Sequence, residues 1–253
     1  MSSLLTSRRE RGIMIPHQKD AVLFFSEGNM IAENVRAVLE KIAGGNCYGE
    51  KITLVAATKT RTPEEINEAI AAGVCDVGEN RVQEFTAKYD FVKGANRHFI
   101  GHLQTNKVKY LIGKTHLLHS LDREELAEEI QKRAERAGVV QDCLIEVNIG
   151  CELSKSGFSR ENALFAYEAM KKYPNIRVRG LMAMLPLSDD RDFLRSLCLS
   201  MREIYDTIKV RDENICHLSM GMSGDWELCT QCGSNMIRLG TTLFGARRLP
   251  QTE

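Results

Sequence analysis

From about residue 30 onward, short apolar runs alternate with longer stretches whose apolar residues recur at helical spacing. The short runs are rich in Val, Ile and Leu and have the length of buried strands, whereas the longer stretches resemble amphipathic helices. The predicted strands are residues 52–58, 74–78, 98–100, 117–121, 143–148, 178–183, 215–219 and 236–239. This alternation predicts an α/β fold, a single (β/α)8 TIM barrel, with a doubly wound sheet as the alternative.

Several of the predicted helices carry recognisable start signals. Residues 62–65 form a Thr-Pro-Glu-Glu capping box with proline at the first helical position, which predicts a helix after the first strand. Asp122 followed by Glu125 predicts a second start, and Ser159 predicts the cap of a third helix.

The first 29 residues follow neither pattern. We interpret them as a flexible N-terminal extension or a mis-assigned start, with the true start at Met14 or Met30. Residues 30–253 are then one barrel domain. An extra N-terminal helix is expected to open it, with a buried face formed by Ile31, Val35, Val38 and Ile42.

Composition excludes several classes of function. Lys plus Arg and Asp plus Glu number 34 each, so no net charge attracts nucleic acid or an anionic membrane. The apolar segment 21–25 is far too short to span a bilayer. The eight cysteines are scattered without a secretory leader, so we expect reduced, buried thiols in a cytoplasmic protein. Cys229 and Cys232 form the only close pair, and no metal site is expected.

Lys59 stands at the end of the first predicted strand, directly before the capping box. The carboxyl ends of barrel strands carry the chemistry of such folds, and a desolvated lysine amine there can act as a nucleophile. Lys59 is therefore a candidate for a Schiff base, and the alternative is a surface lysine that ends a strand.

The last two predicted strands end in segments rich in glycine and hydroxyl groups. One strand ends with Ser219 and is followed by residues 220–225, which include Ser223. The other strand is followed by Gly240 and Thr241. Such segments present backbone N–H groups and hydroxyls to anions, and the loops after strands seven and eight are the usual phosphate site of barrels. Each glycine alone would more often be a turn, but together they predict a phosphate site opposite Lys59.

An amine opposite a phosphate site suits a ligand with an aldehyde at one end and a phosphate at the other. Pyridoxal 5′-phosphate has that form. Arg238 has the strand parity of Gly240 and is expected to point into the barrel mouth, where its permanent charge would keep the pyridine nitrogen unprotonated.

Seven stretches of the chain resemble the YggS-type pyridoxal phosphate homeostasis proteins, which are similar to the N-terminal barrel of alanine racemase. They are residues 57–60, 78–80, 98–107, 148–157, 179–183, 219–223 and 238–247. Together these stretches are highly specific, although each alone is weak. The chain departs from the pattern at His102, where many relatives have proline, at the thiols of Cys229 and Cys232, and in its N-terminal extension.

The resemblance implies that Lys59 forms the internal aldimine and that Asn80 lies beside the cofactor. It also implies that Ser223, Gly240 and Thr241 hold the phosphate, with Arg238 near the ring. Ser219, at the end of the strand that precedes Ser223, is included in the predicted cofactor site. Lys107 and Lys155 match further lysines of the pattern and are predicted as secondary rim sites, with solvated lysines as the equal alternative.

A racemase needs a base on each face of the cofactor, and alanine racemase takes its second base from an additional domain of the partner subunit. This sequence ends at Glu253, soon after its eighth predicted strand. We therefore expect a cofactor-binding protein that buffers pyridoxal phosphate or delivers it to apoenzymes, as a monomer or weak dimer, without robust catalysis. The alternatives are a slow amino-acid racemase and a Schiff-base aldolase for a phosphorylated sugar.

Overall fold

The computed structural model describes residues 27–152 and 154–246. Within them, eight parallel strands close into a barrel, because β4 pairs with β5 as well as with β3. The strands are β1 (Thr53–Ala57), β2 (Asp76–Glu79), β3 (Asn96–Phe99), β4 (Leu117–Leu121), β5 (Gln141–Asn148), β7 (Ile176–Met182), β8 (His217–Ser219) and β9 (Met236–Leu239). A two-residue strand, β6 (Phe158–Ser159), adds to the edge of β5. The TIM-barrel prediction is confirmed, and the doubly wound alternative is wrong because the sheet has closed.

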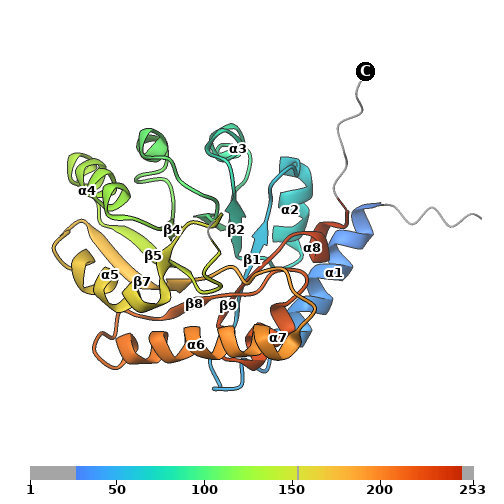
Figure 1. The fold of residues 1–253 in the computed structure, drawn as a ribbon. Helices are drawn as coiled ribbons and strands as arrows, with labels where there is room; N and C mark the ends of the chain where they lie inside the picture. The colour runs from blue at the N-terminus through green and yellow to red at the C-terminus, as the bar shows by residue number, and fades with distance from the viewer. Residues whose placement is uncertain (1–26, 153, 247–253) are drawn as a thin grey trace, which may run out of the picture.

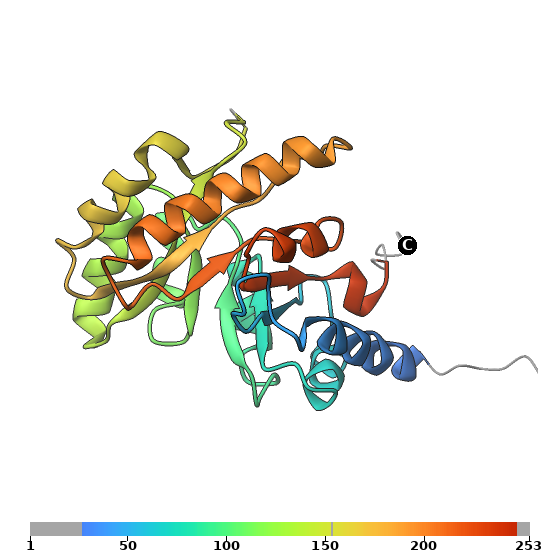
Figure 2. The same ribbon diagram turned by 90° about the horizontal axis from the view of Figure 1, so that it is seen from below.

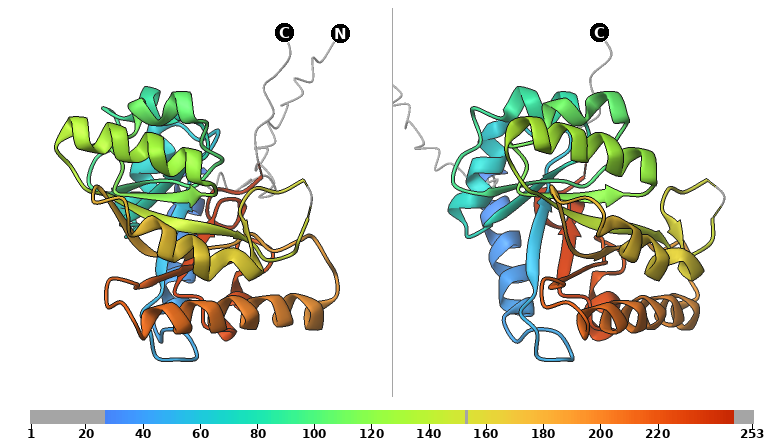
Figure 3. Two further views of the ribbon diagram at one scale, coloured as in Figure 1. Left: turned by 60° about the vertical axis from the view of Figure 1, so that its left-hand side comes forward. Right: turned by 90° about the vertical axis from the view of Figure 1, so that its left-hand side faces the viewer.

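Helices surround the strands (Figure 1). They are α1 (Glu27–Ile42), α2 (Pro63–Ala71), α3 (Val82–Lys88), α4 (Glu124–Ala137), α5 (Ala163–Met170), α6 (Arg191–Lys209), α7 (Trp226–Gln231) and α8 (Thr241–Phe244), with the 3-10 helices η1 (Thr105–Tyr110) and η2 (Arg160–Asn162). The first and last strands are neighbours, so α8 lies beside α1 (Figure 2). In a side view α1 runs alongside β1 (Figure 3).

The helix α1 packs through a single apolar face. Ile31, Val35, Val38 and Ile42 are all buried, in the same cluster as residues of β1 and β9. The amide of Asn34 donates to the carbonyl of Leu243 at 3.1 Å, which ties α1 to α8. The prediction of a flexible extension concerns residues that, apart from 27–29, lie outside the described part of the chain.

The cap signals had mixed outcomes. At Thr62 the capping box is present, with the Glu65 carboxylate accepting from Thr62 N at 2.8 Å. The predicted helix start near Asp122 is confirmed to within one residue, because α4 begins at Glu124 with Arg123 at the N-cap. The capping role of Asp122 is wrong: its buried carboxylate pairs instead with His102 and Arg123. Ser159 does stand at the N-cap, but of η2, and its side chain makes no capping hydrogen bond. Tertiary partners thus outcompeted the local cap at Asp122.

Apolar side chains fill two regions, one between the barrel and its helices and one inside the barrel. Alternate residues of each strand face the two regions, as the period of a strand requires. The interior cluster comprises Val55, Ala57, Ile100, Leu117, Leu144, Met182 and Met236. Polar side chains of the same strand parity, including Glu146 and Arg238, therefore lie on the inside of the wall.

The prediction of buried cysteines is wrong for three of the eight. Cys47, Cys75 and Cys151 are exposed and lie in connections, and Cys216 is half-buried. Cys229 and Cys232 lie on or beside α7 in the core, with the Cys229 sulfur 3.7 Å from that of Cys198. In the described ranges no helix is long and apolar enough to cross a bilayer.

Candidate functional site

A pocket opens at the carboxyl ends of the strands. The space within it, including the part open to solvent, is about 900 Å³. The connections after β1, β2, β8 and β9 all contribute to its lining. Six of the seven predicted site residues line it together: Lys59, Asn80, Ser223, Arg238, Gly240 and Thr241. The structure therefore brings the predicted amine and the predicted anion-binding segments to one cavity.

Lys59 reaches this pocket because of its position on β1. Val55 and Ala57 of this strand face the barrel interior, and Lys59 continues the same parity two residues beyond. The side chain is partly buried. The next residue, Thr60, has a φ of 64°, a left-handed conformation that is a genuine outlier for a β-branched residue. The chain thus turns sharply at Thr60, immediately after the lysine.

Arg238 forms part of the pocket and is held rigidly. Its Nη1 donates to the hydroxyl and the carbonyl of Ser219 at 2.6 and 2.9 Å, and its Nη2 donates to the carbonyl of Ala183 at 3.0 Å. Only 4% of the residue is exposed. Burial lowers the pKa of this guanidinium from its ordinary value, and the nearby Glu146 carboxyl opposes that shift. An arginine with a lowered pKa remains charged near neutral pH, so a fixed cation lines the pocket.

A chain of buried hydrogen bonds continues from Ser219 through the barrel. The Ser219 hydroxyl lies 3.3 Å from His119 Nδ1, and His119 Nε2 lies 2.8 Å from His98 Nδ1. His98 Nε2 is 3.0 Å from a carboxylate oxygen of Asp76, at the amino end of β2. Burial lowers the pKa of both histidines, which favours their neutral forms.

These contacts assign the direction of each hydrogen bond. The Asp76 carboxylate can only accept, so His98 donates from Nε2 and accepts at Nδ1 from His119. His119 then accepts at Nδ1 from the hydroxyl of Ser219, whose oxygen accepts from Arg238. The orientation of Arg238 is therefore supported from the opposite end of the barrel.

The segments after β8 and β9 meet at the other side of the pocket. Thr242 N donates to the hydroxyl of Ser223 at 3.3 Å, which joins the two segments. Gly224 and Gly240 keep this side open: a Cβ on Gly224 would meet no atom within 4 Å, and one on Gly240 would have its nearest contact at 3.5 Å. The glycines thus leave room for a ligand beside backbone N–H groups and hydroxyls.

Asn80 contributes a buried acceptor to the lining of the pocket. Its side-chain Oδ1 is buried and has no hydrogen-bond partner among the described residues. A buried acceptor without a partner is costly, and a donor group of a bound ligand would satisfy this one. With an amine, a fixed cation and a glycine-lined cradle, the residues present fit a phosphorylated aldehyde such as pyridoxal 5′-phosphate.

The remaining predicted residues lie elsewhere. Ser219 is fully buried and does not line the pocket, so its described role is to hold Arg238; a cofactor contact by Ser219 stays a prediction. Lys107, on η1, lines a neighbouring hollow that shares Asn80 with the pocket. Lys155 is exposed in the connection that follows β5. Neither of these two lysines lines the pocket, and their rim roles stay predictions.

Two residues of this region were missed in the sequence. Arg61 lines the pocket and donates from Nη2 to the carbonyl of Gly245 at 2.6 Å, which joins the connection after β1 to the end of α8. Glu146 lies inside the barrel with 3% of its surface exposed. Its signal in the sequence is a single carboxylate within the otherwise apolar run 143–147.

The Glu146 carboxyl predicts a pH dependence of stability. Burial, with the charge of Asp122, raises its pKa from 4.5 to about 7, although Arg238, Arg123 and Lys155 oppose the shift. The folded state therefore binds this proton more tightly than the unfolded state. At about 1.4 kcal/mol per pKa unit, this contribution is full below pH 4.5 and falls by about 3 kcal/mol as the pH rises through 7.

The substitution Glu146→Gln keeps the shape of the neutral carboxyl but cannot ionise. We expect its free energy of unfolding, relative to wild type, to rise by about 3 kcal/mol between pH 4.5 and 8. Denaturant titrations at both pH values measure this difference, in which the contributions of other groups cancel. A difference that is independent of pH would show that Glu146 titrates as an ordinary glutamate.

Comparisons with known proteins agree with this geometry. Residues 29–248 match the model of the family described as alanine racemase, N-terminal domain. A pyridoxal phosphate homeostasis protein of Aquifex aeolicus is 44% identical over 223 residues, which cover 86% of this chain and 96% of that protein.

Solved structures show the same likeness. A protein from Bifidobacterium adolescentis superposes with a TM-score of 0.81 at 32% identity, covering 88% of this chain and 98% of the other. PipY of Synechococcus elongatus, solved with pyridoxal phosphate (PLP) bound, superposes with a TM-score of 0.74 at 28% identity, covering 85% of this chain and 100% of PipY.

Proposed function

The chain belongs to the alanine racemase N-terminal domain family and, within it, to the pyridoxal phosphate homeostasis proteins, and from this premise we propose that it binds pyridoxal 5′-phosphate as a Schiff base on Lys59. We propose further that it takes part in vitamin B6 homeostasis by buffering the cofactor or delivering it to apoenzymes. The observation that carries this proposal is the single pocket in which Lys59 and the two anion-binding segments meet.

Different residues of the pocket would contact different parts of the cofactor. When bound, pyridoxal phosphate supplies an aldehyde that a lysine amine captures reversibly as an imine. Ser223, Gly240 and Thr241 offer a hydroxyl and backbone N–H groups to a phosphate. Arg238 places a fixed positive charge in the pocket, which disfavours protonation of any basic nitrogen beside it. Asn80 offers its buried acceptor to a donor of the ligand.

The same lining argues for a carrier and against an efficient enzyme. Among the described residues that line the pocket, the titratable groups are Lys59, Arg61 and Arg238. Arginine stays protonated in proteins, so Lys59 is the one group suited to accept a proton. Racemisation needs proton transfer on both faces of the bound substrate. We therefore propose that the chain has no robust catalytic activity, and that weak racemase-like turnover is the most its lining supports.

The receivers of the cofactor are PLP-dependent apoenzymes, and the chain acts as a monomer or weak dimer. It works in the cytoplasm, where thiols such as its eight cysteines stay reduced.

Spectroscopy of the purified chain tests this function. We expect saturation with pyridoxal phosphate to produce an absorbance band of a protonated imine. Borohydride should remove the band and fix the cofactor on the peptide that contains Lys59. Mixing the loaded protein with a PLP-dependent apoenzyme should restore that enzyme's activity faster than passive release into buffer. A chain that stays colourless, or a label on another lysine, would contradict the proposal.

A further inference from the structure

We infer that Lys88 of α3, together with Glu84, is a positioning residue for Lys59. The inference rests on the proposed function, because its importance comes from the amine that Lys59 supplies. Lys88 and Glu84 do not line the Lys59 pocket. They position the Lys59 side chain through hydrogen bonds to the backbone on either side of it. We call Lys88, Glu79 and Glu84 the Lys88 clamp.

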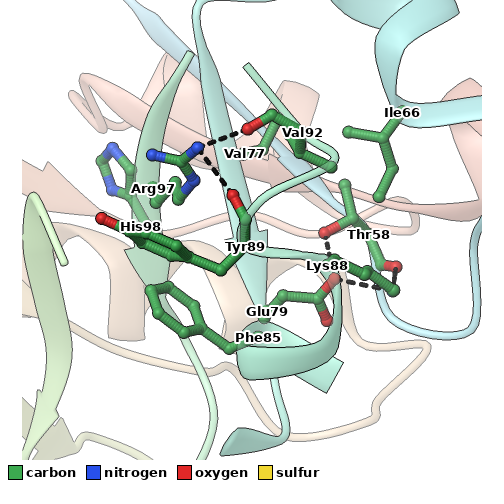
Figure 4. A pocket seen from close by; sticks show the side chains of 10 residues that line it. All are labelled: Thr58, Ile66, Val77, Glu79, Phe85, Lys88, Tyr89, Val92, Arg97 and His98. Atoms are coloured by element: carbon green, nitrogen blue, oxygen red, sulfur yellow. Dashed lines mark hydrogen bonds and ion pairs between the residues drawn. The ribbon is translucent and has the colours of Figure 1, made fainter. Parts of the chain in front are cut away.

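The ammonium of Lys88 binds the chain on the N-terminal side of Lys59. Its Nζ donates to the carbonyl of Thr58 at 2.9 Å, to Glu79 Oε1 at 2.8 Å and to Glu84 Oε2 at 3.2 Å. A lysine ammonium has three N–H donors, so these three acceptors saturate it. Figure 4 shows Lys88 between Thr58 and Glu79, beside a small cavity bounded by β2, β3 and α3.

The carboxylate of Glu84 binds the chain on the C-terminal side of Lys59. Its Oε2 accepts from the backbone N–H of Thr60 at 2.7 Å. Thr60 is the residue with the left-handed φ of 64°. Strained residues of this kind persist only where their surroundings hold them, and they are concentrated at functional sites. The Glu84 carboxylate supplies such a restraint.

Thr58 makes two further hydrogen bonds, which connect the clamp to β1 and β2. The Thr58 hydroxyl donates to Glu79 Oε1 at 2.7 Å, and Thr58 N donates to the carbonyl of Gly78 at 2.9 Å. The side chains of Glu79 and Lys88 are 8% and 14% exposed. Burial raises the pKa of Glu79, and its contact with Lys88 opposes that shift. Because both partners are largely buried, solvent screens their attraction less than that of a surface ion pair.

The consequence is a fixed exit direction for Lys59. Its preceding carbonyl is held by Lys88 and its following N–H group by Glu84, so both flanking peptide groups are anchored to α3. A nucleophile reacts at its full rate only when it is held close to the productive geometry, and displacements of about 1 Å can cost about a hundredfold. The Lys88 clamp thus preorganises the amine for capture of the aldehyde.

The test compares imine formation in folded variants. In Glu84→Ala the Thr60 N–H loses its acceptor, and in Lys88→Met the Thr58 carbonyl loses its donor. We expect the rate constant of imine formation with pyridoxal phosphate, followed by stopped-flow absorbance, to fall about tenfold in each. Glu129→Ala is the matched control, since Glu129 also forms an i,i+4 ion pair on a helix with similar side-chain exposure, 20% against 22%.

A rescue experiment separates positioning from general damage. Glycine adopts left-handed conformations without strain, so Thr60→Gly in the Glu84→Ala background should bring the rate constant back to within about threefold of wild type. Amide hydrogen exchange at Thr60 in the cofactor-free chain should quicken in Glu84→Ala, which reports the lost hydrogen bond without any bound cofactor. Should Lys88→Met fail to fold, Glu84→Ala and its rescue decide the question.

The outcomes are distinguishable. Imine formation at the wild-type rate in folded Glu84→Ala would overturn the clamp while leaving the proposed function intact. A slow Glu84→Ala variant that Thr60→Gly does not rescue would also overturn it. A wild-type chain that forms no imine would instead overturn the proposed function.

Discussion

Replacing Lys59 with alanine is expected to abolish the imine absorbance of the loaded protein completely. Alanine has no amine, so capture of the aldehyde at this position is lost while the Ser223, Gly240 and Thr241 side of the pocket persists. Binding should therefore weaken by at least about a hundredfold, equivalent to about 2.7 kcal/mol, without disappearing. Equilibrium dialysis measures the affinity, and borohydride followed by peptide mapping measures the covalent fraction.

Two other lysines provide the controls for this prediction. Lys107 and Lys155 lie outside the pocket lining, so Lys107→Ala and Lys155→Ala should keep the band and its borohydride sensitivity. The thermal midpoint of Lys59→Ala without cofactor should match that of wild type, because a partly buried lysine at a strand end contributes little to the core. A persistent band in Lys59→Ala would assign the Schiff base to a different amine.

The second large effect is expected at Gly180, on β7. A Cβ on this residue would lie 1.8 Å from the backbone carbonyl oxygen of His217, on the paired strand β8, and the φ of Gly180 is 148°. Neither the strand pairing nor the backbone conformation accepts a side chain. We expect Gly180→Ala to lower the free energy of unfolding by about 4 kcal/mol or more, or to prevent folding. Denaturant titration or the yield of folded protein measures this loss.

The variant Gly113→Ala is the control, because it introduces backbone strain without steric overlap. Gly113 has a φ of 76°, and a Cβ there would meet no atom within 4 Å. Gly113→Ala should therefore cost only the conformational penalty of about 1 kcal/mol. If both alanine variants lost the same amount, the close approach of β7 to β8 would not be what requires Gly180.

Most of the barrel was predictable from local patterns. Buried parallel strands are apolar over several consecutive residues, and the stretch 143–148 lies within β5 for that reason. The capping box at Thr62 was also predictable, because all of its partners lie within four residues. The start of α4 was predictable to within one residue, but the partner of the Asp122 carboxylate was not, since it is His102, twenty residues away. Local signals fail where a distant partner offers a stronger interaction.

The residues that line the site were more predictable than the contacts that hold them in place. Lys59 and Thr241 follow strands whose carboxyl ends must share one face of a barrel, so their meeting followed from the strand prediction. The role of Ser219 beneath Arg238 depends on the alignment of β8 with β9. The contact of Lys88 with the carbonyl of Thr58 depends on how α3 packs, and no spacing in the sequence indicates it.

The sequence by itself determined which stretches are strands and which strand ends carry an amine or a turn rich in glycine and hydroxyl groups, and from these it predicted the class of ligand. Those properties follow from periodicity and residue type, which are local. Only the tertiary structure decided the hydrogen-bond chain from Arg238 to Asp76, the raised pKa of Glu146 and the anchoring of Lys59 by α3. The reason is that barrel closure and helix packing bring distant residues together and remove them from water, and both the strength and the direction of polar interactions depend on that burial.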